Sequence, residues 1–130
     1  MRGQALVEFA LCAPVLVALA LGAVVVVRVA DGRAGLDQAS ATAAAVAARA
    51  PDAPSAEAAA RSSFSSIAAG YPLETPTLAL DLQGFARGAT ISATGKADVS
   101  LDLAPLPGLP RVVRLKSVAR SRIQPWRTRT

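Results

Sequence analysis

The chain has 130 residues, of which 14 are basic and 9 acidic, and its formal net charge is +5. The apolar content is 52% but the aromatic content only 4%, so the apolar surplus is mostly alanine, which buries little area per residue. The sequence has no histidine and one cysteine, which excludes a zinc site, a cysteine–histidine nucleophile and an internal disulfide. Because the acidic residues are also scattered, we expect no enzyme activity, no cofactor and no metal.

The first element is a long apolar segment near the N-terminus. Nineteen residues from Phe9 to Val27 carry no charge. As a helix they measure about 28 Å, close to the roughly 30 Å hydrocarbon core of a bilayer. The sequence therefore predicts a membrane-spanning helix over residues 4–28 that includes Gly22. Pro14 removes one backbone hydrogen bond and predicts a kink there, or a role in subunit packing.

An acidic residue, Glu8, immediately precedes this uncharged segment. A carboxylate within a membrane span costs a few kcal/mol near the bilayer centre and less near an end, so its presence needs a reason. One interpretation places Glu8 at the membrane interface, where the positive end of the helix dipole favours an acid. The other rests on its distance from Gly3: Arg2 and Gly3 form a short basic leader, and Glu8 is the fifth residue after that glycine.

The residues from Gly3 to Leu11 read GQALVEFAL, and Pro14 and an alanine, leucine and valine run follow. This stretch resembles the prepilins, and within them the TadE-like pseudopilins of the tight-adherence (Tad, Flp) pilus. The resemblance implies cleavage after Gly3 by a prepilin peptidase, with Gln4 as the new first residue. It also implies that Glu8 neutralises the N-terminal ammonium of a neighbouring subunit during assembly.

Other interpretations of the N-terminal segment fit less well. A secretory signal cut near residues 18–20 would yield an exported soluble protein, but Glu8 would interrupt its apolar core. Cys12 fits as a small packing residue in the apolar run, because Leu11 before it does not suit a lipoprotein site.

Beyond the membrane segment the helical pattern continues to about residue 49, although two glycines lower the helix propensity. Pro51 and Pro54 mark a turn, and Asp52 or Ser55 is the expected cap of a second helix over residues 53–69.

The periodicity then changes from helical to alternating. Strands are predicted near residues 77–83, 89–103 and 111–123, with a connection at 83–88 and a proline-rich loop at 105–110. Gly95 falls on the inner face of the second strand, where it marks a bulge or a close helix approach. The fold class is therefore α+β: a long N-terminal helix packed on a small antiparallel sheet of about three strands, which is pilin-like.

The positive charge is concentrated at the C-terminal end. Residues 111–130 hold seven basic residues and no acidic one, whereas the rest holds seven basic and nine acidic residues. A solvated strand edge, anionic lipid or an acidic neighbouring subunit would each account for this basic surface. We expect no nucleic-acid partner, since no recognition helix or aromatic platform is present. The predicted basic surface consists of Arg114, Lys116, Arg120 and Arg122.

The sequence thus predicts a minor pilin or pseudopilin that assists assembly of an adhesive Tad pilus. Residues 1–3 would be the leader, and residues 29–130 would form a domain outside the cell membrane, since Arg2 favours a cytoplasmic N-terminus. The implied partners are a prepilin peptidase, other pilins, the Tad secretion machinery and membrane lipid, with no small-molecule substrate. The alternative is an unprocessed single-pass membrane protein that uses its basic strand to bind a partner or lipid.

Overall fold

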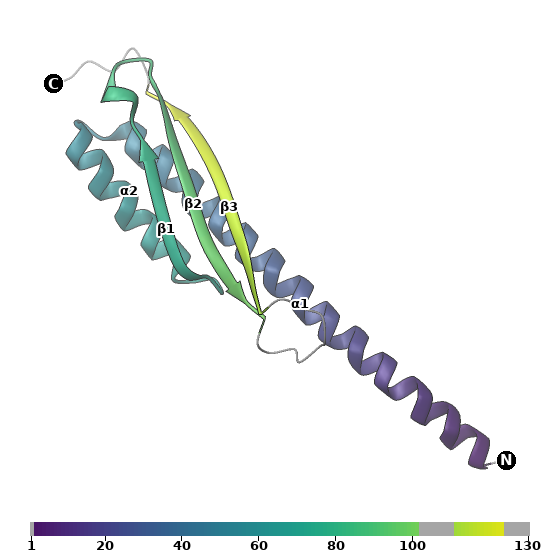
Figure 1. Ribbon diagram of the computed structural model, residues 1–130. Helices are drawn as coiled ribbons and strands as arrows, with labels where there is room; N and C mark the ends of the chain where they lie inside the picture. The colour runs from purple at the N-terminus through teal and green to yellow at the C-terminus, as the bar shows by residue number, and fades with distance from the viewer. Residues whose placement is uncertain (1, 102–110, 124–130) are drawn as a thin grey trace.

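The computed structural model describes residues 2–101 and 111–123 as one long helix, a shorter helix and a three-stranded sheet (Figure 1). The helices are α1 (Arg2–Arg49) and α2 (Ala53–Ala68). The strands are β1 (Glu74–Asp81), β2 (Thr90–Ser100) and β3 (Val112–Arg122), and a single 3-10 turn, η1 (Gln83–Phe85), joins the first two. This arrangement confirms the predicted α+β fold.

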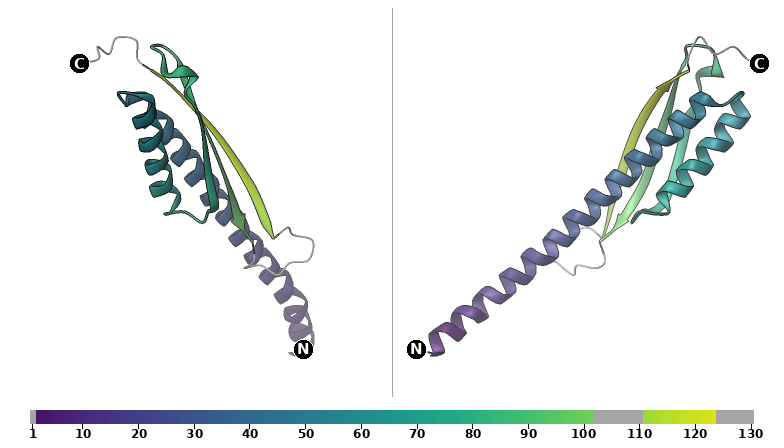
Figure 2. Two further views of the ribbon diagram at one scale, coloured as in Figure 1. Left: turned by 60° about the vertical axis from the view of Figure 1, so that its left-hand side comes forward. Right: turned by 180° about the vertical axis from the view of Figure 1, so that it is seen from behind.

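The sheet is an antiparallel meander with β2 in the centre. Both helices lie on one of its faces: α1 packs along β2 and β3, and α2 lies beside α1 near β1 (Figures 1 and 2). We call the opposite face of the sheet the outer face. Among the described residues, no helix or strand packs on it. Alternate residues of β2 are accordingly buried, from Ile91 to Val99, and their neighbours are more exposed.

The core between sheet and helices is built largely from alanine. Leu36, Ala39 and Ala43 of α1 are fully buried and recur at helical spacing on one face. From α2, Ala60 and Phe64 join them. Small side chains bring the helices and sheet close together, which makes the packing sensitive to any added volume.

Two glycines lie where elements approach most closely. A Cβ placed on Gly35 of α1 would lie 2.6 Å from Cδ1 of Tyr71, a distance that real side chains do not adopt. A Cβ on Gly95 of β2 would lie 3.0 Å from side-chain carbons of Leu36 and Phe64. Gly95 therefore marks a close helix approach, one of the two roles predicted for it.

The second helix begins as expected. Asp52 is its N-cap, and its carboxylate accepts a hydrogen bond from the Ser55 backbone N–H at 2.8 Å. Asp52 is thus the cap, rather than Ser55.

The boundaries of the strands differ from the alternating pattern in two places. β1 begins at Glu74, and its register shifts between Glu74 and Thr77, so the strand starts earlier than residue 77. The predicted connection at 83–88 contains the turn η1, which brings Phe85 into the core with only 8% of its surface exposed. The loop predicted at 105–110 and the end of the strand predicted to reach residue 103 lie outside the described residues.

Candidate assembly helix and basic strand

The first half of α1 projects away from the sheet as a single rod (Figures 1 and 2). We call residues 2–27 the apolar rod and residues 28–49 the covered half. Eleven large apolar side chains of the rod are 52–70% exposed, whereas Leu21 and Val25 are half-buried. The helix is long and apolar enough to span a membrane, and none of the residues in its most apolar stretch is buried. The exposed apolar side chains of the rod are Leu6, Val7, Phe9, Leu11, Val15, Leu16, Val17, Leu19, Val24, Val26 and Val27.

The predicted processing and assembly residues lie at the far end of this rod. Gly3, Gln4 and Glu8 are all exposed and helical. Glu8 is four residues beyond Gln4, which corresponds to about 6 Å along the helix axis and nearly the same face. An ammonium created at Gln4 would therefore lie about one helical turn from the Glu8 carboxylate.

The predicted membrane residues are distributed along the rod. Phe9 and Val27, at the two ends of the uncharged run, are 70% and 58% exposed. A Cβ added at Gly22 would meet no neighbouring atom within 4 Å. α1 continues through Pro14 as one helix, and Figure 1 shows no sharp bend along its N-terminal half, so the predicted kink is absent. These side chains are available to lipid or to another helix.

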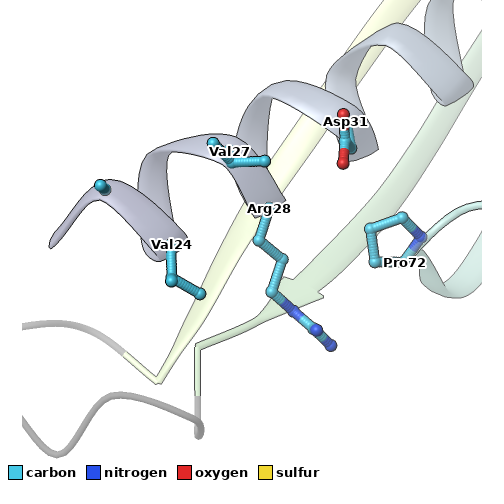
Figure 3. A pocket seen from close by; sticks show the side chains of 6 residues that line it. Val24, Val27, Arg28, Asp31 and Pro72 are labelled. Carbon is cyan, nitrogen blue, oxygen red and sulfur yellow. The ribbon is translucent and has the colours of Figure 1, made fainter. Parts of the chain in front are cut away.

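The junction between rod and sheet is held by Arg28. Its Nε donates a hydrogen bond to the Ser100 carbonyl oxygen at 2.8 Å, across 72 residues of sequence. The sequence pattern did not indicate this contact. In Figure 3 the Arg28 side chain extends from α1 toward the end of β2, beside a shallow hollow of about 370 Å³ lined by Val24, Val27, Asp31 and Pro72. Arg28 therefore links the end of the apolar segment to the end of the sheet.

The predicted basic residues lie on the outer face of β3. Arg114, Lys116, Arg120 and Arg122 are all exposed, as the alternating pattern predicted. Arg114 lies 3.9 Å from an Asp98 carboxylate oxygen, a weak surface pair. The Nε of Arg122 donates to the Gly88 carbonyl oxygen at 3.2 Å. Arg127 and Arg129 lie outside the described residues.

The basic surface extends onto the central strand. Lys96 of β2 is exposed and lies directly opposite Lys116 of β3 in the sheet register. Like charges in directly opposed positions repel each other, so this face keeps a local excess of positive charge.

The two sets of candidate residues form separate sites. Glu8 lies 20 residues before Arg28 on one helix, about 30 Å along its axis, and the basic surface lies beyond Arg28 on the sheet. Within residues 2–101 and 111–123, no three side chains of the metal-ligating types gather into a cluster.

Comparison with known proteins places the N-terminal segment in a family. Residues 3–45 match the family of TadE-like proteins, a stretch that contains Gly3, Glu8, the rod from residue 3 onward and most of the covered half. No curated protein and no solved structure matches the chain. The match confirms the resemblance found in the sequence: over residues 3–45 the chain is similar to the TadE-like proteins, which associates it with the Tad pilus system.

Proposed function

We propose that the chain is a minor pilin, or pseudopilin, that assists assembly of a Tad-type adhesive pilus. In this proposal a prepilin peptidase cleaves after Gly3, the rod anchors the mature chain in the cell membrane, and the sheet domain lies outside. The chain acts by contact with other pilins and with the Tad secretion machinery, and performs no catalysis. The observation that carries the proposal is the TadE-like match over residues 3–45 on a helix whose apolar half is largely exposed.

The exposure of the rod supports a role in both membrane and filament. In water, so many exposed apolar side chains would drive association, because removing them from water is worth about 25 cal/mol per Å². A bilayer covers them without any partner, and a bundle of similar helices covers them in a filament. The same surface therefore suits a subunit that moves from one environment to the other.

Glu8 favours the packing of rods side by side in a filament. In lipid or in a helix bundle, its carboxylate is stabilised by an opposite charge, since charges attract more strongly where the dielectric constant is low. The ammonium of Gln4 created by cleavage is such a charge. Within one chain this ammonium lies about one helical turn from Glu8. In a filament, the N-terminal ammonium of a neighbouring chain is a second possible partner for Glu8. A paired ammonium and carboxylate lower the cost of packing the rods side by side.

The test replaces Glu8 and measures pili. We expect Glu8→Ala to leave the chain in the membrane fraction after alkaline extraction, because the uncharged run from residue 9 is intact. Piliation, counted by electron microscopy, should be lost. The matched control is Glu57→Ala, which removes an exposed carboxylate from α2, where it pairs only with Arg61 at 3.0 Å. Normal pili in the Glu8→Ala strain would remove the role assigned to this carboxylate.

The exposed basic face of β3 favours a second candidate function, an unprocessed single-pass protein that binds a partner or lipid through that face. Membrane-bound chains that retain Met1 and Arg2 would support this candidate over the first.

A further inference from the structure

The two edge strands of the sheet carry opposite charges on the outer face. β1 contains Glu74 and Asp81 and no basic residue, whereas β3 contains four basic residues and no acidic one. Asp81 and Glu74 are exposed, and within the described residues neither takes part in an ion pair. The strands of the sheet are therefore acidic at one edge and basic at the other, and the Arg61 guanidinium of α2, which also reaches β1, is paired with Glu57.

The register of the sheet sets these charges at matching heights. Asp81 of β1 pairs with Ser92 of β2, and Ser92 pairs with Arg120 of β3. In the same way Glu74 pairs with Asp98, and Asp98 with Arg114. Each acidic residue of one edge thus lies level with a basic residue of the other edge. Two strand spacings of nearly 5 Å each separate the partners within a chain, so they are better placed to meet another chain.

We propose that the sheet domains of two copies of this chain associate side by side, with the basic edge of one copy against the acidic edge of the next. A sideways shift without rotation brings Arg120 beside Asp81 of the second copy and Arg114 beside Glu74. Because a shift without rotation changes no direction, the two apolar rods point the same way, and the two facing strands run parallel, since β1 and β3 are both antiparallel to β2. Two copies anchored in one membrane, as the proposed function requires, must have that orientation.

A two-fold dimer would not bring the acidic edge of one copy against the basic edge of the other. A two-fold axis along the rods would place β3 against β3 or β1 against β1, and like charges would face each other. A two-fold axis across the rods would point them in opposite directions. The remaining contact joins two different edges, so every copy keeps a free edge for a further copy, as in rings and filaments.

Side chains, rather than a continued sheet, carry the contact. Pro76 in β1 has no backbone N–H to offer, and the Leu78 carbonyl oxygen already accepts a hydrogen bond from Arg61 Nη1 at 3.2 Å. Both features discourage another strand from pairing with this edge. The charge pairs are therefore the main source of specificity.

Anionic lipid is a poorer occupant of the basic edge. β3 begins beside the rod and runs away from it along the covered half (Figure 1). From Arg114 to Arg122 the strand rises about 26 Å, whereas salt screens charge over about 8–10 Å under physiological conditions. A membrane surface near Arg28 would not attract Arg120 and Arg122, but an upright neighbouring sheet faces the whole strand.

The test uses cysteines that leave every charge in place. Ala79 and Val118 are uncharged and level with each other, since both align with Thr94 of β2, and neither is buried. Two tagged full-length copies, both carrying Cys12→Ala, are co-expressed, one with Ala79→Cys and the other with Val118→Cys. In isolated membranes treated with a short bismaleimide, the mixed pair should cross-link about tenfold more than two copies with Ala79→Cys or two with Val118→Cys. Equal cross-linking of all three pairs, or none, would overturn the proposal.

Charge reversal then tests the pairing itself. Arg120→Glu in the Val118→Cys copy should lower cross-linking about fivefold, and Asp81→Arg in the other copy should restore it. The matched control is Arg33→Glu in the Val118→Cys copy, the same charge change on the exposed side of α1 rather than at a sheet edge, which should stay within twofold of the parent. An equal loss for Arg33→Glu, or no restoration by Asp81→Arg, would contradict the proposal. The readout needs neither processing nor pili, so it is independent of a failure of the proposed function.

Discussion

The two halves of α1 belong to one continuous helix but differ in what surrounds them: the first half is exposed and the second is covered by the sheet and α2. Residues 2–27 expose leucine, valine and phenylalanine to a large extent, whereas residues 28–49 bury a stripe of glycine, alanine and Leu36. Large apolar side chains suit a surface that will be covered by lipid or by other chains. Small ones suit a surface that must meet a sheet at close range. The difference shows that one helix has two contact surfaces. The covered half meets the sheet of its own chain, whereas the rod needs lipid or another chain to cover it.

The largest effect should come from deleting a large side chain in the covered half. Leu36 is fully buried, and Leu36→Ala should lower the free energy of unfolding of the sheet domain by about 2–5 kcal/mol. Leu16→Ala makes the same change on the rod, where Leu16 is 62% exposed, and should leave it unchanged. Urea unfolding of both variants in detergent, followed by the circular dichroism of the sheet, measures the difference. Equal losses would show that the rod also packs on the sheet.

A smaller effect should follow from adding one methyl group. Gly35→Ala places a Cβ against the Tyr71 ring and should cost about 1–3 kcal/mol despite the better helix propensity of alanine. Gly22→Ala on the rod meets no atom within 4 Å and should not lower stability. The same unfolding assay compares them, and a neutral Gly35→Ala would mean that Tyr71 moves aside freely.

The smallest effect should arise at the junction of the two halves. Arg28→Ala removes the half-buried hydrogen bond to the Ser100 carbonyl and should cost about 1–2 kcal/mol. Arg33→Ala, one and a half turns further along, breaks only an exposed pair with Asp37 and should cost about 0.5 kcal/mol or less. Hydrogen exchange at the end of β2 should rise for Arg28→Ala alone. Unchanged exchange there would show that the sheet does not depend on this link.

Periodicity predicted most of the fold because each element repeats its own signal. The alternation around Ile91 and Val99 specifies which face of β2 is buried, and the alanine spacing around Ala39 does the same for the covered half. Long-range contacts carry no such signal. The Arg28–Ser100 hydrogen bond spans 72 residues of sequence. The burial of Phe85 depends on a turn with positive φ angles, and no periodic pattern in the sequence predicts that turn.

The candidate site divides in the same way. Glu8 could be identified as a candidate from the sequence because a single acidic residue precedes a long uncharged run, and its role stays a prediction. The exposure of the basic residues followed from the alternation in β3. Their level alignment with Glu74 and Asp81 depends on the register of three strands, including the shift between Glu74 and Thr77, and only the folded sheet shows it.

The central claim is that the rod belongs to a processed pilin, and the start of the mature chain tests it most directly. N-terminal sequencing and intact mass should be measured on the chain from membranes of cells with and without their prepilin peptidase. We predict a start at Gln4 when the peptidase is present and at Met1 when it is absent. A start at Met1 in both would contradict the claim and leave an unprocessed membrane protein.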